Sequence, residues 1–254
     1  MRGWAGVAAV ASLILLVRAA AAADPQEAAI GQEVYTQLQQ AGTIVDRPNP
    51  LYDVLDPIAL RIKRIADPQY DVPFAFVILH NAAPNAFAVP GGVVYVTDAL
   101  FHFVQNKEEF ASILCHETAH GIDHDLIHVV GKDQQVATLI GLLGAFSGAV
   151  KSPRGRYGEN LAYAMQTNSY GLDVENAADR KGADTCAAAG YNPWGMVWLF
   201  QNFDKIDSDG AMEALSDQIS EVHRIGNLES YFESDPQLFG GFPSNGATAT
   251  ALLP

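Results

Sequence analysis

The sequence contains 254 residues, a length that suits one domain large enough to bury a hydrophobic core. Hydrophobic residues make up 49% of the chain and charged residues 17%, proportions typical of a globular rather than a disordered protein. The formal net charge of -14 argues against binding to nucleic acid, which requires clustered Lys and Arg, and against attraction to an anionic membrane surface.

The first 23 residues have the pattern of a cleaved export signal. Arg2 gives a positive start, residues 6–17 are apolar, and residues 19–23 are small residues suited to cleavage. An uncleaved membrane anchor is the alternative, but the run is shorter than the about 20 apolar residues that span a bilayer, and Arg18 interrupts it. We therefore expect residues 1–23 to be a signal peptide, the mature chain to have no stable membrane span, and the protein to be periplasmic or secreted.

Helices dominate the predicted secondary structure, with one small sheet among them. Hydrophobic spacing predicts helices over about residues 25–40 and 51–66. Three apolar segments then predict strands at residues 74–79, 86–89 and 93–96. Further helices are predicted from about residue 107 and over about residues 168–189, 193–203 and 217–231. This order of elements indicates an α+β fold.

Two segments are expected to differ from the rest of the domain. Residues 136–150 are nearly all apolar but too few to span a membrane, so we expect a buried or substrate-facing helix, with a membrane-touching patch as the alternative. Residues 235–254 are rich in Gly and Pro and are expected to form a loosely ordered C-terminal tail. The predicted catalytic domain therefore spans residues 24–234.

The chain has two cysteines, Cys115 and Cys186. An oxidising compartment would permit a disulfide between them, but two cysteines do not make a disulfide framework. A buried free thiol is the commoner outcome for a residue such as Cys115, which lies on a predicted helix. Both states stay open at the level of the sequence.

The pattern His116-Glu117-Thr-Ala-His120 carries the clearest chemical signal. On a helix, residues four apart share a face, so both imidazoles can bind one zinc ion. Glu117 is then placed to take a proton from the water on the metal, whose pKa zinc lowers toward about 7. A surface helix with incidental histidines is the alternative. The pattern lies in a helical segment, as the chemistry requires, and predicts one zinc ion per chain.

A catalytic zinc ion takes three protein ligands, so a third is required. His124 and His128 continue the four-residue spacing, but each further turn of a straight helix carries the side chain away from the metal. The metzincin spacing also fails, because it requires Gly and His at the positions that hold Asp123 and Leu126. The third ligand is therefore expected on another element.

A second predicted helix offers a better candidate in the stretch Glu175-Asn-Ala-Ala-Asp179. Glu175 and Asp179 lie one turn apart on one face of that helix. Glu175 would complete a site of two histidines and one glutamate, and Asp179 could accept a hydrogen bond from a ligand imidazole. Asp173 is a nearby rival, and ordinary exposed helix charges are the alternative interpretation.

Several separated blocks of the sequence resemble one family. The matching blocks are residues 85–96, the motif at 116–120, residues 170–182 around Glu175, and residues 189–193. Together with the early helices, the likeness covers most of residues 25–230. The chain resembles the HtpX and CAAX prenyl protease family of zinc metallopeptidases (metallopeptidase family forty-eight), and within it the soluble periplasmic BepA-like members.

The resemblance implies a gluzincin, or zincin-like, fold that is mostly helical and has a small sheet beside the active-site helix. It places the glutamate ligand of the family at Glu175. It also implies that residues 92–96 form the edge strand to which an extended peptide adds, main chain to main chain. Glu117 would then return its proton to the leaving amine.

The chain departs from the family near residue 218. The family has a Thr-His-Pro segment whose His-Pro is replaced in this chain by Gln218-Ile219, although the later arginine is kept as Arg224. If the family histidine stabilises the oxyanion, Gln218 could donate a weaker hydrogen bond, or His223 could substitute. Loss of one such donor typically costs about 10²–10³ in rate, so the departure concerns catalysis rather than zinc binding.

We expect a zinc-dependent endopeptidase that cleaves exposed or misfolded proteins of the cell envelope, a substrate class that the resemblance implies. Its partners would be polypeptides, not nucleic acid. The alternative is a catalytically weak or inactive zinc-binding chaperone or assembly factor on the same scaffold. The intact Glu117 favours the enzyme, because a scaffold does not need a general base, whereas Gln218 favours the alternative.

Overall fold

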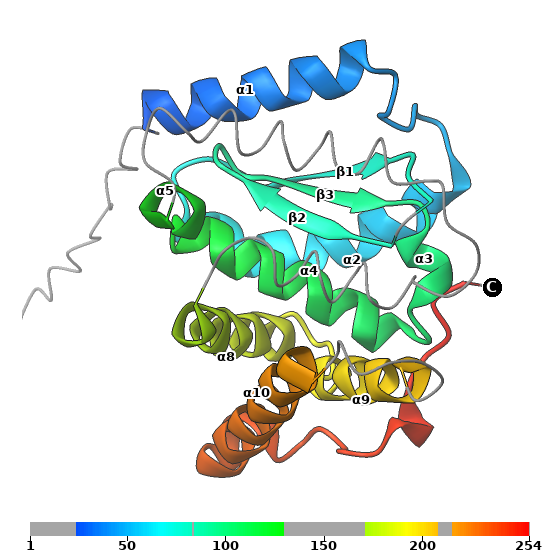
Figure 1. Ribbon diagram of the computed structural model, residues 1–254, viewed down its shortest axis with the longest axis vertical. Helices are drawn as coiled ribbons and strands as arrows, with labels where there is room; N and C mark the ends of the chain where they lie inside the picture. The colour runs from blue at the N-terminus through cyan, green and yellow to red at the C-terminus, as the bar shows by residue number, and fades with distance from the viewer. Residues whose placement is uncertain (1–23, 83, 130–170, 208–214, 254) are drawn as a thin grey trace, which may run out of the picture.

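The computed structural model describes residues 24–82, 84–129, 171–207 and 215–253, with the backbone alone at 129, 203–207 and 215–220. Two predicted features lie outside the described residues: the signal peptide at residues 1–23 and the apolar segment at residues 136–150. The described part is mostly helical and has one three-stranded sheet, which confirms the predicted α+β class (Figure 1).

The sheet forms from the three apolar segments that the sequence predicts as strands: β1 (Ala75–Leu79), β2 (Ala86–Val89) and β3 (Val93–Thr97). β2 and β3 form an antiparallel hairpin, and β1 pairs with β3 in parallel. Gly91 and Gly92 have φ angles of 87° and 79°, a region that glycine adopts without steric cost, so the chain can reverse between β2 and β3.

The expectation that residues 92–96 form an edge strand is wrong. The strand order is β1-β3-β2, so β3 lies in the centre of the sheet, and four of its five residues are buried. The hairpin makes β2 and β3 neighbours, but the sequence pattern does not determine which of them pairs with β1. Within the described residues, β2 is the edge strand on the side of the active-site helix.

Alternation of side chains along the strands sends the two faces of the sheet into separate cores. One face packs on α1 (Pro25–Gln40), whose buried residues Ile30, Val34 and Leu38 repeat at the spacing of one helix face. The opposite face packs on α2 (Pro50–Ala66) and on α4 (Lys107–Ile122). The sheet therefore lies between two helical layers (Figure 1).

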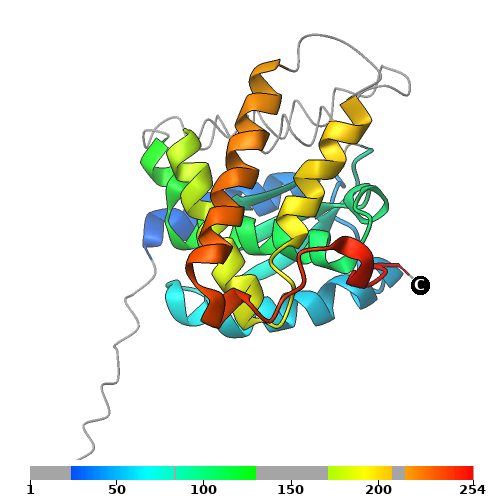
Figure 2. The ribbon, with the colours of Figure 1, turned by 90° about the horizontal axis from the view of Figure 1, so that it is seen from below.

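Three long helices cover the side of α4 that faces away from the sheet: α8 (Leu172–Ala188), α9 (Gly195–Asp207) and α10 (Leu215–Ser234). Figures 1 and 2 show α8 and α9 beside α4, with α10 packed against α8 and α9. The remaining described elements are short: η1 (Asp67–Gln69), α3 (Leu100–Phe103), α5 (Asp125–Val129), α11 (Pro236–Phe239) and η2 (Gly246–Thr248). None of the helices in the described ranges is long and apolar enough to cross a membrane.

α4 and α8 pack closely beside the motif. A glycine of α8 leaves room for the backbone of α4, and a disulfide links the two helices there. A Cβ atom added at Gly182 of α8 would lie 3.0 Å from both the Cα and the backbone nitrogen of His116. One residue before His116, Cys115 forms a disulfide with Cys186 of α8, with 5.8 Å between the two Cα atoms. The structure thus resolves the open question of the two cysteines as a disulfide bond.

The C-terminal segment after α10, which we expected to be loosely ordered, packs on the domain. Phe239 and Leu252 are buried in the larger core. The indole N–H of Trp198 donates to the carbonyl of Ser244, and the carbonyl of Thr250 accepts the backbone N–H of Lys107. Glycines and prolines shape the turns here, while the few apolar side chains between them supply the packing.

Candidate metal centre

The motif helix α4 lies at the centre of the domain. Asn106 caps its first turn by accepting the backbone N–H of Glu109 at 2.8 Å, as expected for an N-cap residue. His116 and His120, one turn apart, are 1% and 4% exposed. Their Nε2 atoms lie 3.0 Å apart, so both imidazoles point at the same place.

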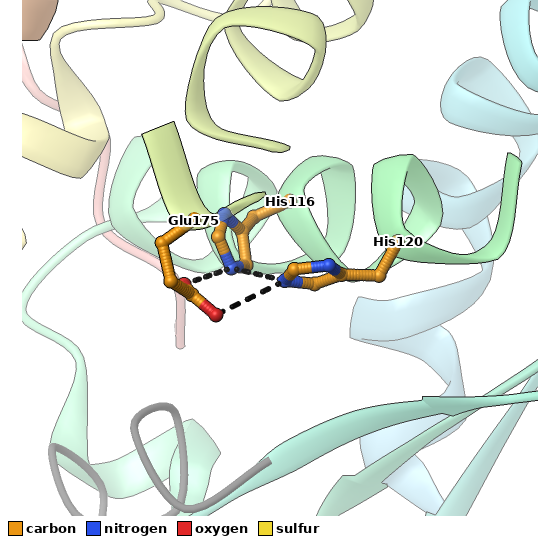
Figure 3. Close-up of side chains that lie close together, drawn as sticks. All are labelled: His116, His120 and Glu175. Carbon is orange, nitrogen blue, oxygen red and sulfur yellow. Dashed lines mark hydrogen bonds and ion pairs between the residues drawn. The ribbon is translucent and has the colours of Figure 1, made fainter. Parts of the chain in front are cut away.

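Glu175 from the first turn of α8 reaches the same place (Figure 3). Its Oε2 lies 3.4 Å from His116 Nε2, and its Oε1 lies 3.6 Å from His120 Nε2. One ligand atom from each of the three residues lies within 4.8 Å of the others, and all three residues are buried. Two helices therefore bring together the three residues that the sequence singled out as ligands.

These residues fit a zinc ion. Both carboxylate oxygens of Glu175 are buried and accept no hydrogen bond of good geometry within the described residues; Oε2 forms an ion pair with Arg224, and Oε1 has no such cation beside it. A buried acceptor without a donor is costly, and a bound cation would remove that cost. Two imidazole nitrogens and one carboxylate are the ligand set of many catalytic zinc sites, which keep a fourth position open for water or substrate.

Asp179 lies behind His116, as the sequence suggested. Its Oδ1 is 3.0 Å from His116 Nδ1, the ring nitrogen opposite the metal-facing one. Burial opposes a charge on His116, but the carboxylates of Asp179 and Glu175 outweigh it and raise the pKa of His116 to about 10. A carboxylate at Nδ1 holds the ring in one orientation and leaves Nε2 for the metal.

Arg224 of α10 lies between the two carboxylates and pairs with both. Its guanidinium donates to both oxygens of Asp179, at 2.8 and 2.7 Å, and its Nη1 lies 3.2 Å from Glu175 Oε2. Burial raises the pKa of a carboxyl group, but Arg224 outweighs it and keeps the pKa of Asp179 well below its usual range. The resemblance identified Arg224 as an arginine that the family shares. The sequence did not indicate that it lies beside the metal ligands.

Sequence reasoning missed Asp125 as part of the site. Its Oδ2 lies 2.8 Å from His120 Nδ1, so each ligand histidine has a carboxylate behind it. The only signal in the sequence is the distance of five residues from His120, which does not reveal contact. The contact arises because the chain turns sharply after α4.

Glu117 is buried beside the ligands and contacts the edge strand. The backbone N–H of Ala88 in β2 donates to Glu117 Oε2 at 3.0 Å. Burial raises the pKa of Glu117, and this effect outweighs the opposing influence of His116 and His120. The carboxyl group is therefore a stronger base than an exposed glutamate.

Other residues considered from the sequence lie away from the three ligands. His124 pairs with Glu27 of α1, at 2.6 Å, and His128 is exposed. Asp173 and His223 are also exposed, so neither points into the site. Gln218 belongs to α10, and its side chain lies outside the described residues.

The fold and the three converging side chains define a zincin-like metallopeptidase. The family model for peptidase family M48 matches residues 51–240, well over half of the chain, so the chain belongs to that family. This match confirms the resemblance that the sequence motifs indicated, together with the mostly helical zincin-like fold and the zinc cofactor.

Named relatives agree with this assignment. The chain is 31% identical over 182 residues to the beta-barrel assembly-enhancing protease of Yersinia pestis, an alignment that covers 69% of this chain and 37% of that protein. The protein of the same name in Escherichia coli (strain K12) is 28% identical over 177 residues, covering 67% and 36%. The mitochondrial metalloendopeptidase OMA1 of Saccharomyces cerevisiae is 24% identical over 235 residues, covering 85% and 66%. The chain thus spans little more than a third of the two bacterial relatives.

Proposed function

We propose that the chain is a zinc-dependent endopeptidase that cleaves exposed or misfolded segments of cell-envelope proteins. The observation that carries this proposal is the contact between Glu117 and the N–H of Ala88. It joins the general base beside the metal ligands to the edge of a sheet, which is the surface where an extended peptide can add.

The edge of β2 is suited to such a peptide. Ala88 lies opposite Val94 of β3 in the sheet register, and its N–H donates to Glu117 rather than to β3. A substrate strand along this edge would run past Glu117 and the three ligands. Folded proteins rarely offer an unpaired strand, which supports exposed or unfolded segments as the substrate class.

The residues of the chain have separate tasks in hydrolysis. His116, His120 and Glu175 would hold zinc, which when bound polarises the scissile carbonyl and lowers the pKa of its water ligand. Glu117 takes the proton of the attacking water and delivers it to the leaving amine. Asp179 and Asp125 keep the two imidazoles oriented, and the Ala88 N–H keeps the Glu117 carboxylate oriented.

We further propose that the protein acts after export, in the periplasm or outside the cell. The positive, apolar and small-residue pattern of residues 1–23 supports an export signal. The disulfide between Cys115 and Cys186 also supports an oxidising compartment, because such bonds are rare in reducing ones. Two relatives are named as enhancing beta-barrel assembly, which supports envelope proteins as the substrates.

The substrate class can be tested by comparing two substrates: casein, which is unfolded, and a compact protein without loose segments. Each is incubated with purified residues 24–254 and zinc. We expect internal cuts in casein, located by mass spectrometry, far slower cleavage of the compact protein, and loss of both after zinc chelation. Release of terminal residues alone would contradict an endopeptidase. Equal cleavage of both proteins would contradict the proposed preference for exposed segments.

A further inference from the structure

A buried glutamate joins the N-terminal helix to the end of the active-site helix. Glu27, in the first turn of α1, is only 7% exposed. Its Oε1 lies 2.6 Å from His124 Nδ1, and its Oε2 accepts the Tyr70 hydroxyl at 2.5 Å. The Tyr70 oxygen accepts the Gly91 N–H at 3.1 Å. Glu27 thereby connects α1, the end of α4 and the turn between β2 and β3.

Tight packing holds α1 at this place. Gly31, one turn after Glu27, lies so close to the hairpin turn that an added Cβ would be 2.4 Å from the carbonyl oxygen of Pro90. Ile30 and Val34 of α1 pack in one core with residues of the sheet. The carboxylate of Glu27 is therefore presented to His124 by a helix that has little room to shift.

The backbone of His124 is unusual. Its φ angle is 55°, in the left-handed region that is unfavourable for a residue with a Cβ and that glycine or asparagine normally occupies after a helix. His124 follows Asp123, the C-cap of α4, and it is the only non-glycine residue with positive φ in the described ranges. Such a conformation persists where surrounding contacts impose it.

This turn determines where the next residue lies. Asp125 immediately follows His124 and brings Oδ2 within 2.8 Å of His120 Nδ1. A carboxylate at that nitrogen fixes the orientation of a ligand imidazole and its tautomer. If α4 continued as a regular helix, residue 125 would lie away from the face of the helix that carries the metal ligands.

We propose that Glu27 is a positioning residue for the zinc site. By holding His124 in the left-handed conformation, Glu27 sets the position of Asp125, which orients the ligand His120. The inference rests on the zinc site of the proposed function and adds to it a residue outside the segment that matches the family, residues 51–240.

The zinc dissociation constant, measured by competition with a chromophoric chelator, tests the proposal. Glu27→Ala is expected to raise it about tenfold, at the lower end of the 10–100-fold effect of residues behind metal ligands, because Glu27 acts through two other residues. His124→Ala is expected to do the same, since it keeps the unfavourable backbone and loses the contact. The His124→Ala variant also leaves Glu27 paired with Tyr70. It therefore still tests the proposal if Glu27→Ala does not fold.

The substitution His124→Gly distinguishes a positioning role of Glu27 from a general contribution of Glu27 to stability. Glycine adopts positive φ without a side-chain contact, so the double variant Glu27→Ala with His124→Gly should bind zinc within about threefold of wild type. Glu33→Ala, an exposed glutamate of the same helix, is the matched control and should leave the constant unchanged.

Different results would contradict the positioning role of Glu27 and the zinc site itself. Wild-type affinity in Glu27→Ala and His124→Ala would overturn the positioning role alone, and so would a double variant no better than Glu27→Ala. Wild-type protein that binds no zinc would contradict the zinc site itself, and this inference with it.

Discussion

Arg224 lies between the carboxylates of Glu175 and Asp179, and its guanidinium also packs over the ring of Phe200, 4.6 Å from the ring centre. The arginine is 5% exposed, so it is buried together with the two carboxylates that contact the histidines. Each buried ion loses its hydration, so charges of opposite sign must face one another; Arg224 offsets one of the two negative charges, and a bound zinc ion would offset the other. At the scale of single residues, Arg224 is therefore the counter-charge that allows two acids to stand beside the metal ligands.

Arg224→Met should lower the free energy of unfolding of the metal-free protein by about 3–5 kcal/mol, because two buried carboxylates lose their cation. Saturating zinc should reduce the difference, since the metal charge then compensates Glu175. Urea unfolding with chelator and with zinc measures both values. Arg64→Met, at an exposed position of α2, is the control and should change stability by less than about 0.5 kcal/mol. A metal-free Arg224→Met protein as stable as wild type would contradict this account.

At the scale of elements, the site depends on how closely α8 approaches α4. His116, His120 and Glu117 come from α4, whereas Glu175 and Asp179 come from α8. Gly182 permits the approach, because any side chain there would meet the backbone of His116. The relative position of two helices thus sets the distances among the metal ligands.

Gly182→Ala should push α8 away from α4 and lower both stability, by about 1–3 kcal/mol, and zinc affinity. Backbone atoms 3.0 Å from the new Cβ cannot turn aside as a flexible side chain could. Gly226→Ala in α10 is the matched control, since outside the backbone of the helix itself no atom of the described residues lies within 4 Å of a Cβ at that position. The control should leave zinc affinity unchanged and raise stability by up to about 1 kcal/mol. Equal zinc affinity in Gly182→Ala and wild type would show that the helix spacing does not set the site.

The disulfide joins the same two helices and links residues 71 apart in sequence. Replacing both cysteines by alanine should lower the free energy of unfolding by about 2–4 kcal/mol, because the unfolded chain regains the freedom that the bond removes. Urea unfolding with and without a reductant provides the measurement. Reductant should destabilise the wild type and leave the double variant unchanged. A wild type insensitive to complete reduction would contradict the structural role of the bond.

At the scale of the whole molecule, local sequence patterns predicted the helices and strands, whereas long-range packing determined the strand order and the packing of the C-terminal segment. The helix with His116 and His120 and the strand at Ala86–Val89 follow from short-range signals. Which strand becomes central does not, because pairing with β1 depends on the entire domain. The packed C-terminal segment shows the same limit: a few apolar residues, such as Phe239, outweigh a composition typical of loops.

The supporting residues of the site were hidden from the sequence for the same reason. Arg224 and Asp125 contact the ligands, and Glu27 contacts His124, only through the arrangement of α10, the turn after α4, and α1. Acidic and basic residues are common on helices, so no spacing distinguishes these three from solvent-exposed charges. Ligand spacing is a local property, whereas the environment of each ligand is a property of the fold.

Zinc content and casein cleavage of purified residues 24–254, measured beside Glu117→Gln, test whether the chain is a zinc peptidase with Glu117 as its base. We expect one zinc per chain in both proteins, with cleavage in the wild type and a loss of several orders of magnitude in the variant, because the base is gone while the ligands remain. One zinc per chain with no cleavage in either protein would favour a zinc-binding scaffold and direct attention to Gln218. No bound zinc in the wild type would contradict the assignment of His116, His120 and Glu175.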